Sequence, residues 1–395
     1  MPYSISVNQP SLGAVPEDAK SKPHHVKNND GSLNKFRNPH PSYKAAFQPW
    51  QYPLKAIMGQ LDGSMVMPAP KGETVPIRAP SLLSSRTGSQ DLRTTWLGHA
   101  CHYAEYPSGL RVLFDPVMED RCSPFTFMGP RRYTRRACGV ADLPSLDAVF
   151  ISHNHYDHLS LLTVQEIKAR FPHAHFFVGL GLAAWFRASG VDNVTEMDWW
   201  EDAEVTVRPD DGDGDAAKGE ITATVSCLPA QHGSARSPFD HEKTLWCSWA
   251  VKSGGKAVYF AGDTGYRTVP AEDISSSGED GSHDFSKELL AHLPTNPDFA
   301  EIGALRGPFD LGLIPIGAYA PRLLMSPLHA CPADAVEIFR DTRCRRALAI
   351  HWGTWALTSE PVMEPPQRLR EALRLRGIAE EGVFDVCDIG ETRVF

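Results

Sequence analysis

The stretch VFISHNHYDHLS, residues 149–160, places three histidines and one aspartate within six positions, directly behind a short apolar run. The four side chains are His153, His155, Asp157 and His158. Imidazoles and a carboxylate are costly to hold so close together unless a positive charge lies between them. The first two side chains alternate outward from an extended segment, and the last two turn back where a helix begins. The cluster can therefore face two metal ions.

Three other apolar runs end on side chains of the same kind. SCLPAQ is followed by His232, AVYFAG by Asp263 and RALAI by His351. Binding sites are commonly built on loops at one edge of a rigid sheet, so we expect these side chains to meet the 153–158 cluster. A lone histidine is more often a hydrogen-bonded structural residue. Seven His and Asp groups without cysteine instead fit two zinc ions, which accept nitrogen and oxygen and can share a bridging carboxylate.

The rest of the chain predicts an α/β protein with layered sheets and helices. Short runs rich in Val, Ile, Phe and Trp, among them LRVLF, DAVFIS and DLGLIPIG, indicate strands. Residues 161–171, 332–343 and 365–377 show helical periodicity instead. The first of these helices places four apolar residues on one face: Leu161, Val164, Ile167 and Phe171. Such alternation predicts sheets covered by helices.

Composition separates this chain from several classes of protein. The net charge of −9 argues against a nucleic-acid binder, which usually presents a basic face. Eight cysteines without a CxxC pair indicate reduced thiols. There is no visible secretory signal, and no window approaches the roughly 18 apolar residues of a membrane span. We therefore expect an intracellular protein, cytoplasmic or peripheral to an internal membrane.

The HxHxDH motif and the strand-end residues resemble the metallo-β-lactamase superfamily. Its fold is an αββα sandwich with a binuclear site at the edge of the sheets. Longer stretches resemble one family within it, the N-acylphosphatidylethanolamine-hydrolysing phospholipases D. These stretches are TWLGHA (95–100), FMGPRR (127–132), DWWE (198–201), FAGDTGY (260–266), GPFDLGLIPIGAYAPR (307–322) and IHWGTWAL (350–357). They follow one another from Thr95 to the C-terminal region, whereas the N-terminal residues match only weakly.

The resemblance implies a binuclear zinc phosphodiesterase that cleaves N-acylphosphatidylethanolamine to an N-acylethanolamine and phosphatidic acid. One zinc ion would be held by His153, His155 and His232. The other would be held by Asp157, His158 and His351, with Asp263 between the two ions. The resemblance also gives catalytic roles to Asp157, Asp263 and His329.

Four further residues have two interpretations each. The resemblance places Tyr156 and His329 at the substrate phosphate. From the residues alone, they would be a packing aromatic and a surface histidine. His99 would either be a structural residue or hold a metal ligand by a hydrogen bond. Arg322 would meet either a phosphate or a carboxylate.

The predicted partner is a membrane phospholipid substrate, reached by peripheral membrane contact. The resemblance admits a homodimer, while the residues themselves leave the oligomeric state open. Ala235 stands where animal members of the family carry a lysine that helps to hold bile acids, so bile-acid binding is not expected.

Domain organisation follows from composition. Residues 1–45 are polar and aperiodic, which predicts a disordered tail. Residues 46–395 would form the metallo-β-lactamase-like hydrolase domain, with an N-terminal extension at 46–90 and an insertion at 267–305. The apolar segment 47–61 would either pack across the sandwich or meet the membrane.

Two other functions stay open at the level of sequence. The first is another hydrolase of the same fold, such as a lactonase or a soluble phosphodiesterase. The second is a metal-binding protein without turnover, against which the presence of all seven ligands argues. A nuclease is disfavoured by the negative charge and by the lack of a basic stripe.

Overall fold

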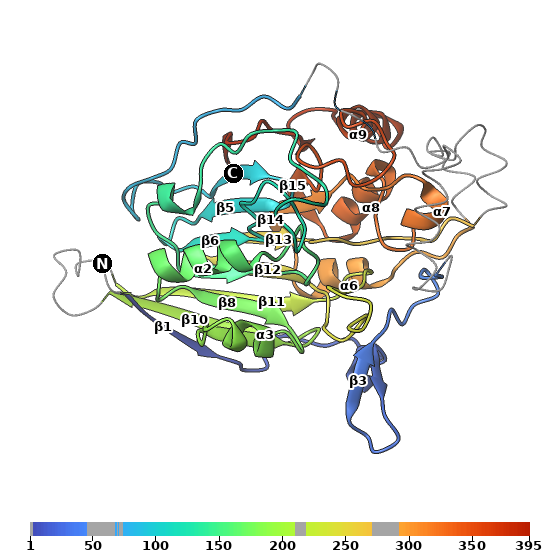
Figure 1. Cartoon of the computed structure of the whole chain (residues 1–395), viewed down its shortest axis with the longest axis horizontal. Coiled ribbons are helices and arrows are strands. Elements are labelled where there is room, and N and C mark those ends of the chain that lie inside the picture. Colours follow the sequence, from blue (N-terminus) through green and yellow to red (C-terminus); the bar gives the residue numbers. More distant parts are fainter. Residues whose placement is uncertain (1–2, 46–67, 69, 71–73, 210–218, 271–291) are drawn as a thin grey trace.

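Two β-sheets pack face to face, and helices cover their outer faces (Figure 1). The computed structural model describes residues 3–45, 68, 70, 74–209, 219–270 and 292–395. The larger sheet has eight strands in the order β1 (Tyr3–Asn8), β10 (Asp202–Pro209), β11 (Ile221–Leu228), β12 (Ser248–Ser253), β13 (Lys256–Phe260), β14 (Phe309–Pro315), β15 (Cys344–Ile350) and β16 (Phe384–Asp385). Neighbours from β1 to β13 are antiparallel, and those from β13 to β16 are parallel.

The smaller sheet repeats this mixed design with seven strands. Their order is β17 (Thr392–Val394), β4 (Arg93–Gly98), β5 (Cys101–Glu105), β6 (Arg111–Phe114), β7 (Ala148–Phe150), β8 (His175–Gly179) and β9 (Val194–Met197). Pairs up to β6 are antiparallel, and β6 to β9 are parallel. Parallel strands need crossover connections, and this is where helices enter the chain.

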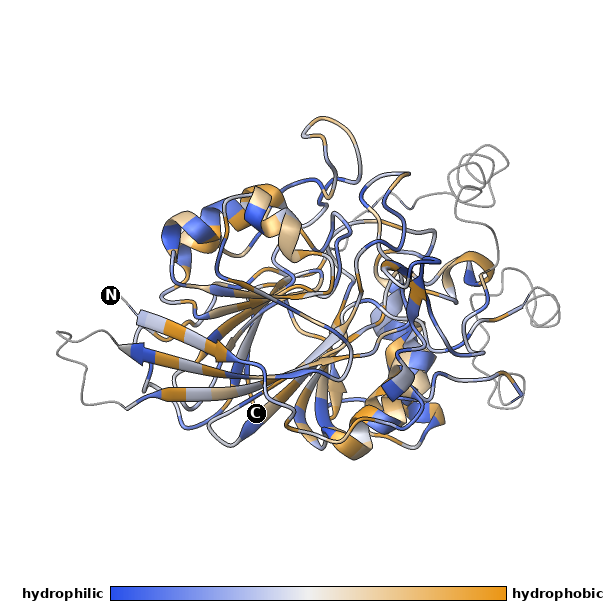
Figure 2. Ribbon diagram, turned by 90° about the horizontal axis from the view of Figure 1, so that it is seen from below, coloured by the Kyte–Doolittle hydropathy of each residue, from blue (hydrophilic) through white to orange (hydrophobic). Residues whose placement is uncertain are grey.

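Aromatic side chains join the two sheets in the core. The ring centroids of Phe114 and Phe260 lie 4.8 Å apart, and those of Phe150 and Trp249 lie 5.5 Å apart. Side chains alternate across a strand, so Val149 points to the opposite face and packs in the outer cluster beneath the helices. Figure 2 shows the hydrophobic residues along the strands and on the helices that cover them. All eight cysteines are free, and all but Cys138 are buried, as predicted.

Helices complete the outer layers. The smaller sheet is covered by α2 (Leu161–Arg170), α3 (Ala183–Ala188) and the short η3 (Val140–Asp142). The larger sheet is covered by α6 (Asp298–Leu305), α8 (Pro332–Asp341) and α9 (Glu364–Leu375), and α7 (Arg322–Met325) is a single turn. Three residues of the apolar face predicted for 161–171 are buried, namely Val164, Ile167 and Phe171, but Leu161 in the first turn of α2 is 45% exposed. This arrangement is the predicted αββα sandwich.

The prediction of a disordered tail at 1–45 is wrong for residues 3–45. Strand β1 pairs with β10 from Tyr3 opposite Pro209 to Asn8 opposite Glu204. Further along, η1 (Ala19–Ser21) precedes the hairpin of β2 (His25–Lys27) and β3 (Leu33–Phe36). The edge of the distant strand β10 supplies the backbone hydrogen bonds that order β1, and Phe36 at the end of the hairpin is buried in the main core.

The predicted insertion at 267–305 extends too far. Its last residues form α6, which lies in the connection between the parallel strands β13 and β14 and packs against α8. A crossover helix is part of the sheet topology, so residues 298–305 are not an insertion. The predicted membrane segment 47–61 lies outside the described residues. Within the described ranges, no helix is both long and apolar enough to cross a bilayer.

Candidate metal centre

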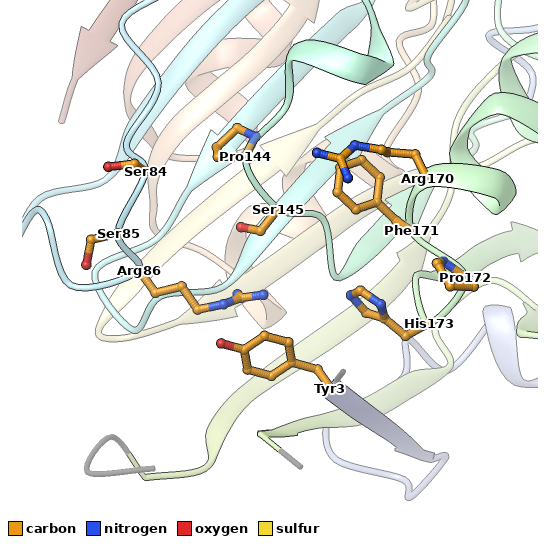
Figure 3. Close-up of a pocket in the computed structure, with 10 residues that line it drawn as sticks. All are labelled: Tyr3, Ser84, Ser85, Arg86, Pro144, Ser145, Arg170, Phe171, Pro172 and His173. Atoms are coloured by element: carbon orange, nitrogen blue, oxygen red, sulfur yellow. The ribbon is translucent and has the colours of Figure 1, made fainter. Parts of the chain in front are cut away.

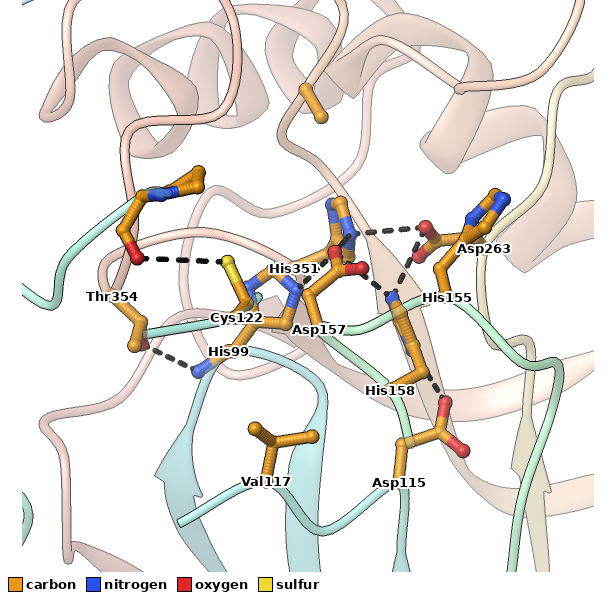
Figure 4. A network of polar contacts seen from close by, with 12 residues as sticks. His99, Asp115, Val117, Cys122, His155, Asp157, His158, Asp263, His351 and Thr354 are labelled. Carbon is orange, nitrogen blue, oxygen red and sulfur yellow. Dashed lines mark hydrogen bonds and ion pairs between the residues drawn. The ribbon is translucent and has the colours of Figure 1, made fainter. Parts of the chain in front are cut away.

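The seven predicted ligands meet at the carboxyl ends of strands from both sheets. His153, His155, Asp157 and His158 follow β7 in the smaller sheet, while His232, Asp263 and His351 follow β11, β13 and β15 in the larger sheet. Their polar atoms form two neighbouring groups, with the Asp263 carboxylate between them. Figure 4 shows Asp263 with Asp157, His158 and His351 of one group and His155 of the other. Residues almost 200 positions apart thus share one site, as the strand-end pattern predicted.

The first group consists of three imidazoles that face one another. The Nδ1 atom of His155 lies 2.8 Å from Nε2 of His153 and 3.2 Å from Nε2 of His232. Burial lowers the pKa of His155 and of His232 to about 3, so both rings are neutral near pH 7.

Hydrogen bonds settle which nitrogens of this first group carry protons. The Ser152 hydroxyl donates to Asp115, so its oxygen must accept from Nδ1 of His153, 2.9 Å away. Likewise, Nδ1 of His232 donates to the carbonyl oxygen of Leu328 at 2.9 Å. Both Nε2 atoms are therefore bare lone pairs aimed at His155, whose single proton cannot serve both fully. A divalent cation would satisfy all three nitrogens.

The second group combines a carboxylate with two imidazoles. Oδ2 of Asp157 lies 3.4 Å from Nε2 of His158 and 3.3 Å from Nε2 of His351. Burial would lower the pKa of His158, but the carboxylates of Asp263, Asp157 and Asp115 raise it well above its ordinary value. The pKa of His351 likewise rises to about 9 against the effect of burial, chiefly because of Asp263 and Asp157. Without a metal, protons thus supply the positive charge that the carboxylates demand.

Asp263 lies between the two groups. Its Oδ2 atom is 3.1 Å from Nε2 of His158 and 3.0 Å from Nε2 of His351 in the second group. The same oxygen is 3.7 Å from Nε2 of His232 and 3.9 Å from Nε2 of His153 in the first. Its other oxygen is buried and makes no hydrogen bond to any described residue. Such a carboxylate is placed to bridge two cations.

The backbone around the site is strained. His99, Asp115 and His351 adopt φ angles of 53°, 37° and 62°, a left-handed conformation that non-glycine residues rarely take. Strain of this kind gathers at functional sites, where the surrounding structure enforces it. Three other features accompany this strain: the opposed imidazole lone pairs, the unpartnered Asp263 oxygen and a set of donor atoms without thiolate. Together they indicate a site for a divalent metal ion.

The remaining predicted residues lie at or beside the two groups. Nε2 of His99 lies 3.0 Å from Oδ2 of Asp157, as expected of a residue that holds a ligand. His329 is not a surface histidine, because only 12% of its side chain is exposed, and its Nδ1 lies 4.0 Å from Asp263. The Tyr156 hydroxyl donates to the Arg236 carbonyl at 3.3 Å. Arg322 pairs with the buried Asp334 carboxylate at 2.8 Å, which decides between its two predicted roles.

Sequence reasoning missed Asp115. It follows the apolar run LRVLF at the end of β6, so the rule that found the other strand-end ligands could also have found it. Its carboxylate accepts a hydrogen bond from Nδ1 of His158 at 2.6 Å, which leaves Nε2 free to bind metal. A carboxylate that fixes the tautomer of a histidine ligand is a common feature of metal sites.

Arg236 was also missed, and nothing in its sequence context marks it. Its guanidinium donates to the carbonyl oxygens of Asn154 and Leu159, both at 2.8 Å, and lies 3.9 Å from the centre of the Tyr156 ring. It thereby ties the loop of His232 to both ends of the 153–158 loop.

One cavity lies in a different part of the fold from the predicted ligands. A cavity of about 610 Å³ is lined by Tyr3, Arg86, Ser145, Phe171 and His173, among others (Figure 3). It lies at the amino ends of β7 and β8, opposite to the end that bears the ligands. Of the two arginines that line it, Arg86 is held by Asp147 through two contacts of 2.7 Å, and Arg170 lies 5.3 Å from the centre of the Phe171 ring.

Comparison with known proteins agrees with this geometry. A family model described as the beta-lactamase superfamily domain matches residues 110–277 and 290–352, more than half of the chain. The chain belongs to the metallo-β-lactamase superfamily. It is 37% identical over 306 residues to N-acyl-phosphatidylethanolamine-hydrolyzing phospholipase D 1 of Caenorhabditis elegans, covering 76% of this chain and 75% of the relative.

Two other proteins are similar over comparable lengths of this chain. The mitochondrial N-acyl-phosphatidylethanolamine-hydrolyzing phospholipase D of Saccharomyces cerevisiae is 31% identical, over 81% of this chain and 59% of the relative. The solved structure of Igni18, a metallo hydrolase from Ignicoccus hospitalis, has 21% identity and a TM-score of 0.44, covering 77% of this chain and 98% of its own. As a member of the metallo-β-lactamase superfamily, the chain is a metal-dependent hydrolase.

Proposed function

We propose that this protein is a binuclear zinc phosphodiesterase that hydrolyses N-acylphosphatidylethanolamines to N-acylethanolamines and phosphatidic acid. The position of Asp263, within 3.1 Å of one ligand group and 3.9 Å of the other, is the observation that supports two ions rather than one. The substrate class rests on the two relatives that are named for this reaction.

The ligand groups divide between the two ions as their contacts suggest. His153, His155 and His232 would hold one, and Asp157, His158 and His351 the other, with Asp263 shared. Zinc in such sites acts as a Lewis acid that polarises phosphoryl oxygens and acidifies water. No nucleophilic side chain is then needed to break the phosphodiester.

Two side chains would position the substrate phosphate. His329 is neutral near pH 7, because burial lowers its pKa to about 3, and its buried Nδ1 has no hydrogen-bond partner among the described residues. Tyr156 lies beneath the Arg236 guanidinium, and its hydroxyl donates to the Arg236 carbonyl oxygen. His329 can donate a hydrogen bond to a phosphate oxygen, and Tyr156 would do so by turning its O–H away from that carbonyl, while Asp157 is kept in place by His99.

The substrate sets where the enzyme must work. A phospholipid with a further acyl chain on nitrogen does not leave a bilayer freely, because each buried methylene contributes about 0.8 kcal/mol. We propose that the protein reaches it by peripheral contact with an internal membrane.

The test uses the full chain purified without chelator. Incubation with N-acylphosphatidylethanolamine vesicles in ¹⁸O-labelled water should release unlabelled N-acylethanolamine and phosphatidic acid that carries the label, as measured by mass spectrometry. Label in the N-acylethanolamine would instead mean attack at carbon. Elemental analysis should give close to two zinc ions per chain. Hydrolysis of lactones or soluble phosphodiesters without turnover of the lipid would favour the alternative hydrolase.

A further inference from the structure

A hairpin beside the metal centre exposes an unusual set of apolar side chains. It is formed by residues 121–131, whose ends are joined by an antiparallel bridge between Arg121 and Arg131. At its tip, Phe125, Phe127 and Met128 are 46%, 76% and 55% exposed, and the two phenylalanine rings lie 5.5 Å apart. Single exposed apolar residues are ordinary, but three on one projecting tip mark an interaction surface.

The charge around this hairpin contrasts with the rest of the protein. Residues 121–136 contain five arginines and no acidic residue, although the whole chain has a net charge of −9. Arg131, Arg135 and Arg136 are exposed, and none of them has a carboxylate partner in the part of the chain that the structure describes. Arginine beside exposed aromatic residues suits the interface of a bilayer that carries anionic lipid.

The base of the hairpin is anchored at the metal centre. Cys122 packs with Val117 and Trp355 in a small buried cluster, and the Arg132 guanidinium lies 4.3 Å from the centre of the Trp355 ring. Trp355 donates to the carbonyl oxygen of Asp120 at 3.1 Å. The same tryptophan meets His99 edge to face at 4.9 Å. The tip and the metal ligands are thus held in a fixed relation.

We propose that the 121–131 hairpin is the surface that docks on a bilayer containing anionic phospholipid. Phe125, Phe127 and Met128 enter the interfacial region, and Arg131, Arg135 and Arg136 meet the headgroups. This inference rests on the proposed function, since a lipid substrate explains why an apolar tip is joined to the metal centre, and it deepens that function by naming the membrane-contacting residues.

The test measures sedimentation of the full chain with phosphatidylcholine vesicles, with and without phosphatidylserine. No N-acylphosphatidylethanolamine is present, so binding is scored separately from hydrolysis. We expect the triple variant F125S/F127S/M128S to bind roughly tenfold or more weakly than wild type. The variant R131Q/R135Q/R136Q should lose the part of binding that needs phosphatidylserine and is weakened by salt. Leu375→Ser removes an apolar side chain that is 60% exposed on α9, and it should bind like wild type.

Folding of the variants is checked by thermal unfolding, and the single variant Phe127→Ser serves if the triple variant is unstable. Hydrolysis of a soluble short-chain phosphodiester should be unchanged in all of them. The proposal would be overturned if the wild-type protein bound no vesicle, or if a folded tip variant bound vesicles as tightly as wild type does. If the hairpin governs binding but the lipid is not hydrolysed, the proposed function fails while the surface stands.

Discussion

Asp115 offers the sharpest test of how the protein prepares its ligands. The buried carboxylate receives three hydrogen bonds: from the Ser152 N–H at 2.7 Å, the Ser152 hydroxyl at 2.5 Å and Nδ1 of His158 at 2.6 Å. Asp115→Asn keeps the shape but replaces one oxygen by an NH₂ group. The amide oxygen must stay opposite the fixed backbone N–H, so the NH₂ group takes the place of Oδ2 and faces His158.

The consequence is a change of tautomer in two predicted metal ligands, because the Ser152 hydroxyl also loses its acceptor on Asp115 and must donate to Nδ1 of His153. To accept from the new NH₂ group, His158 must give up its Nδ1 proton and carry it on Nε2, the atom that lies 3.1 Å from Asp263. Loss of an outer hydrogen-bond partner commonly costs 10–100-fold in metal affinity. We expect about a hundredfold, or roughly 2.7 kcal/mol, because the hydrogen bond is reversed and not merely lost.

The assay titrates the metal-free variant with zinc in competition with a chromophoric chelator. Activity should return in large part at saturating zinc, because no ligand has been removed. Asp147→Asn is the matched control: its buried carboxylate binds Arg86 at the opposite end of β7 and touches no predicted ligand. A folded Asp115→Asn protein with wild-type zinc affinity would refute the tautomer argument. Equal losses in both variants would trace the effect to general destabilisation.

Three further predictions concern other residues. Asp263→Asn should lower activity by at least roughly a hundredfold, since it removes the shared ligand; more than half of wild-type turnover with both metals bound would contradict this. Arg236→Lys keeps the positive charge, but a lysine cannot contact two carbonyl oxygens and the Tyr156 ring together. Turnover should therefore fall about tenfold or more, and the visible spectrum of the cobalt-substituted protein should shift. The exposed control variant Arg208→Lys should change neither the turnover nor the spectrum. Burial acts to raise the pKa of Asp198, but hydrogen bonds from His24 and Lys22 hold it well below its ordinary value. The ionised Asp198 carboxylate therefore stabilises the folded protein above about pH 4, and this contribution is lost as the pH falls further. Asp198→Asn should flatten the acid side of a plot of melting temperature against pH. An equally steep acid slope in that variant would count against this role of the Asp198 carboxylate.

Local patterns in the sequence predicted much of the site. HxHxDH is a contiguous motif, and each of the other three ligands directly follows an apolar strand. Strands β13 and β15 run parallel, and β11 points the same way because β12 is antiparallel to both β11 and β13. The carboxyl ends that carry His232, Asp263 and His351 therefore meet at one edge of the sheet. The helical periods at 332–343 and 365–377 likewise predicted α8 and α9, because amphipathic spacing is a local property.

Only the tertiary structure decided the features that depend on distant partners. The composition of the polar residues 3–45 predicted a disordered tail. It carries no information about the edge of β10, which lies some 200 residues away and pairs with β1. The proton on His158 that Asp115 fixes and the contacts of Arg236 with the 153–158 loop both arise from contacts across loops. The exposed hairpin was equally unforeseen, since a run such as SPFTFMG looks no different in sequence when it is buried. Periodicity and motifs depend on residues that are close in sequence, so they can be read from the sequence alone. Strand pairing, the tautomer of a histidine and the exposure of a side chain depend on which distant segments pack against it.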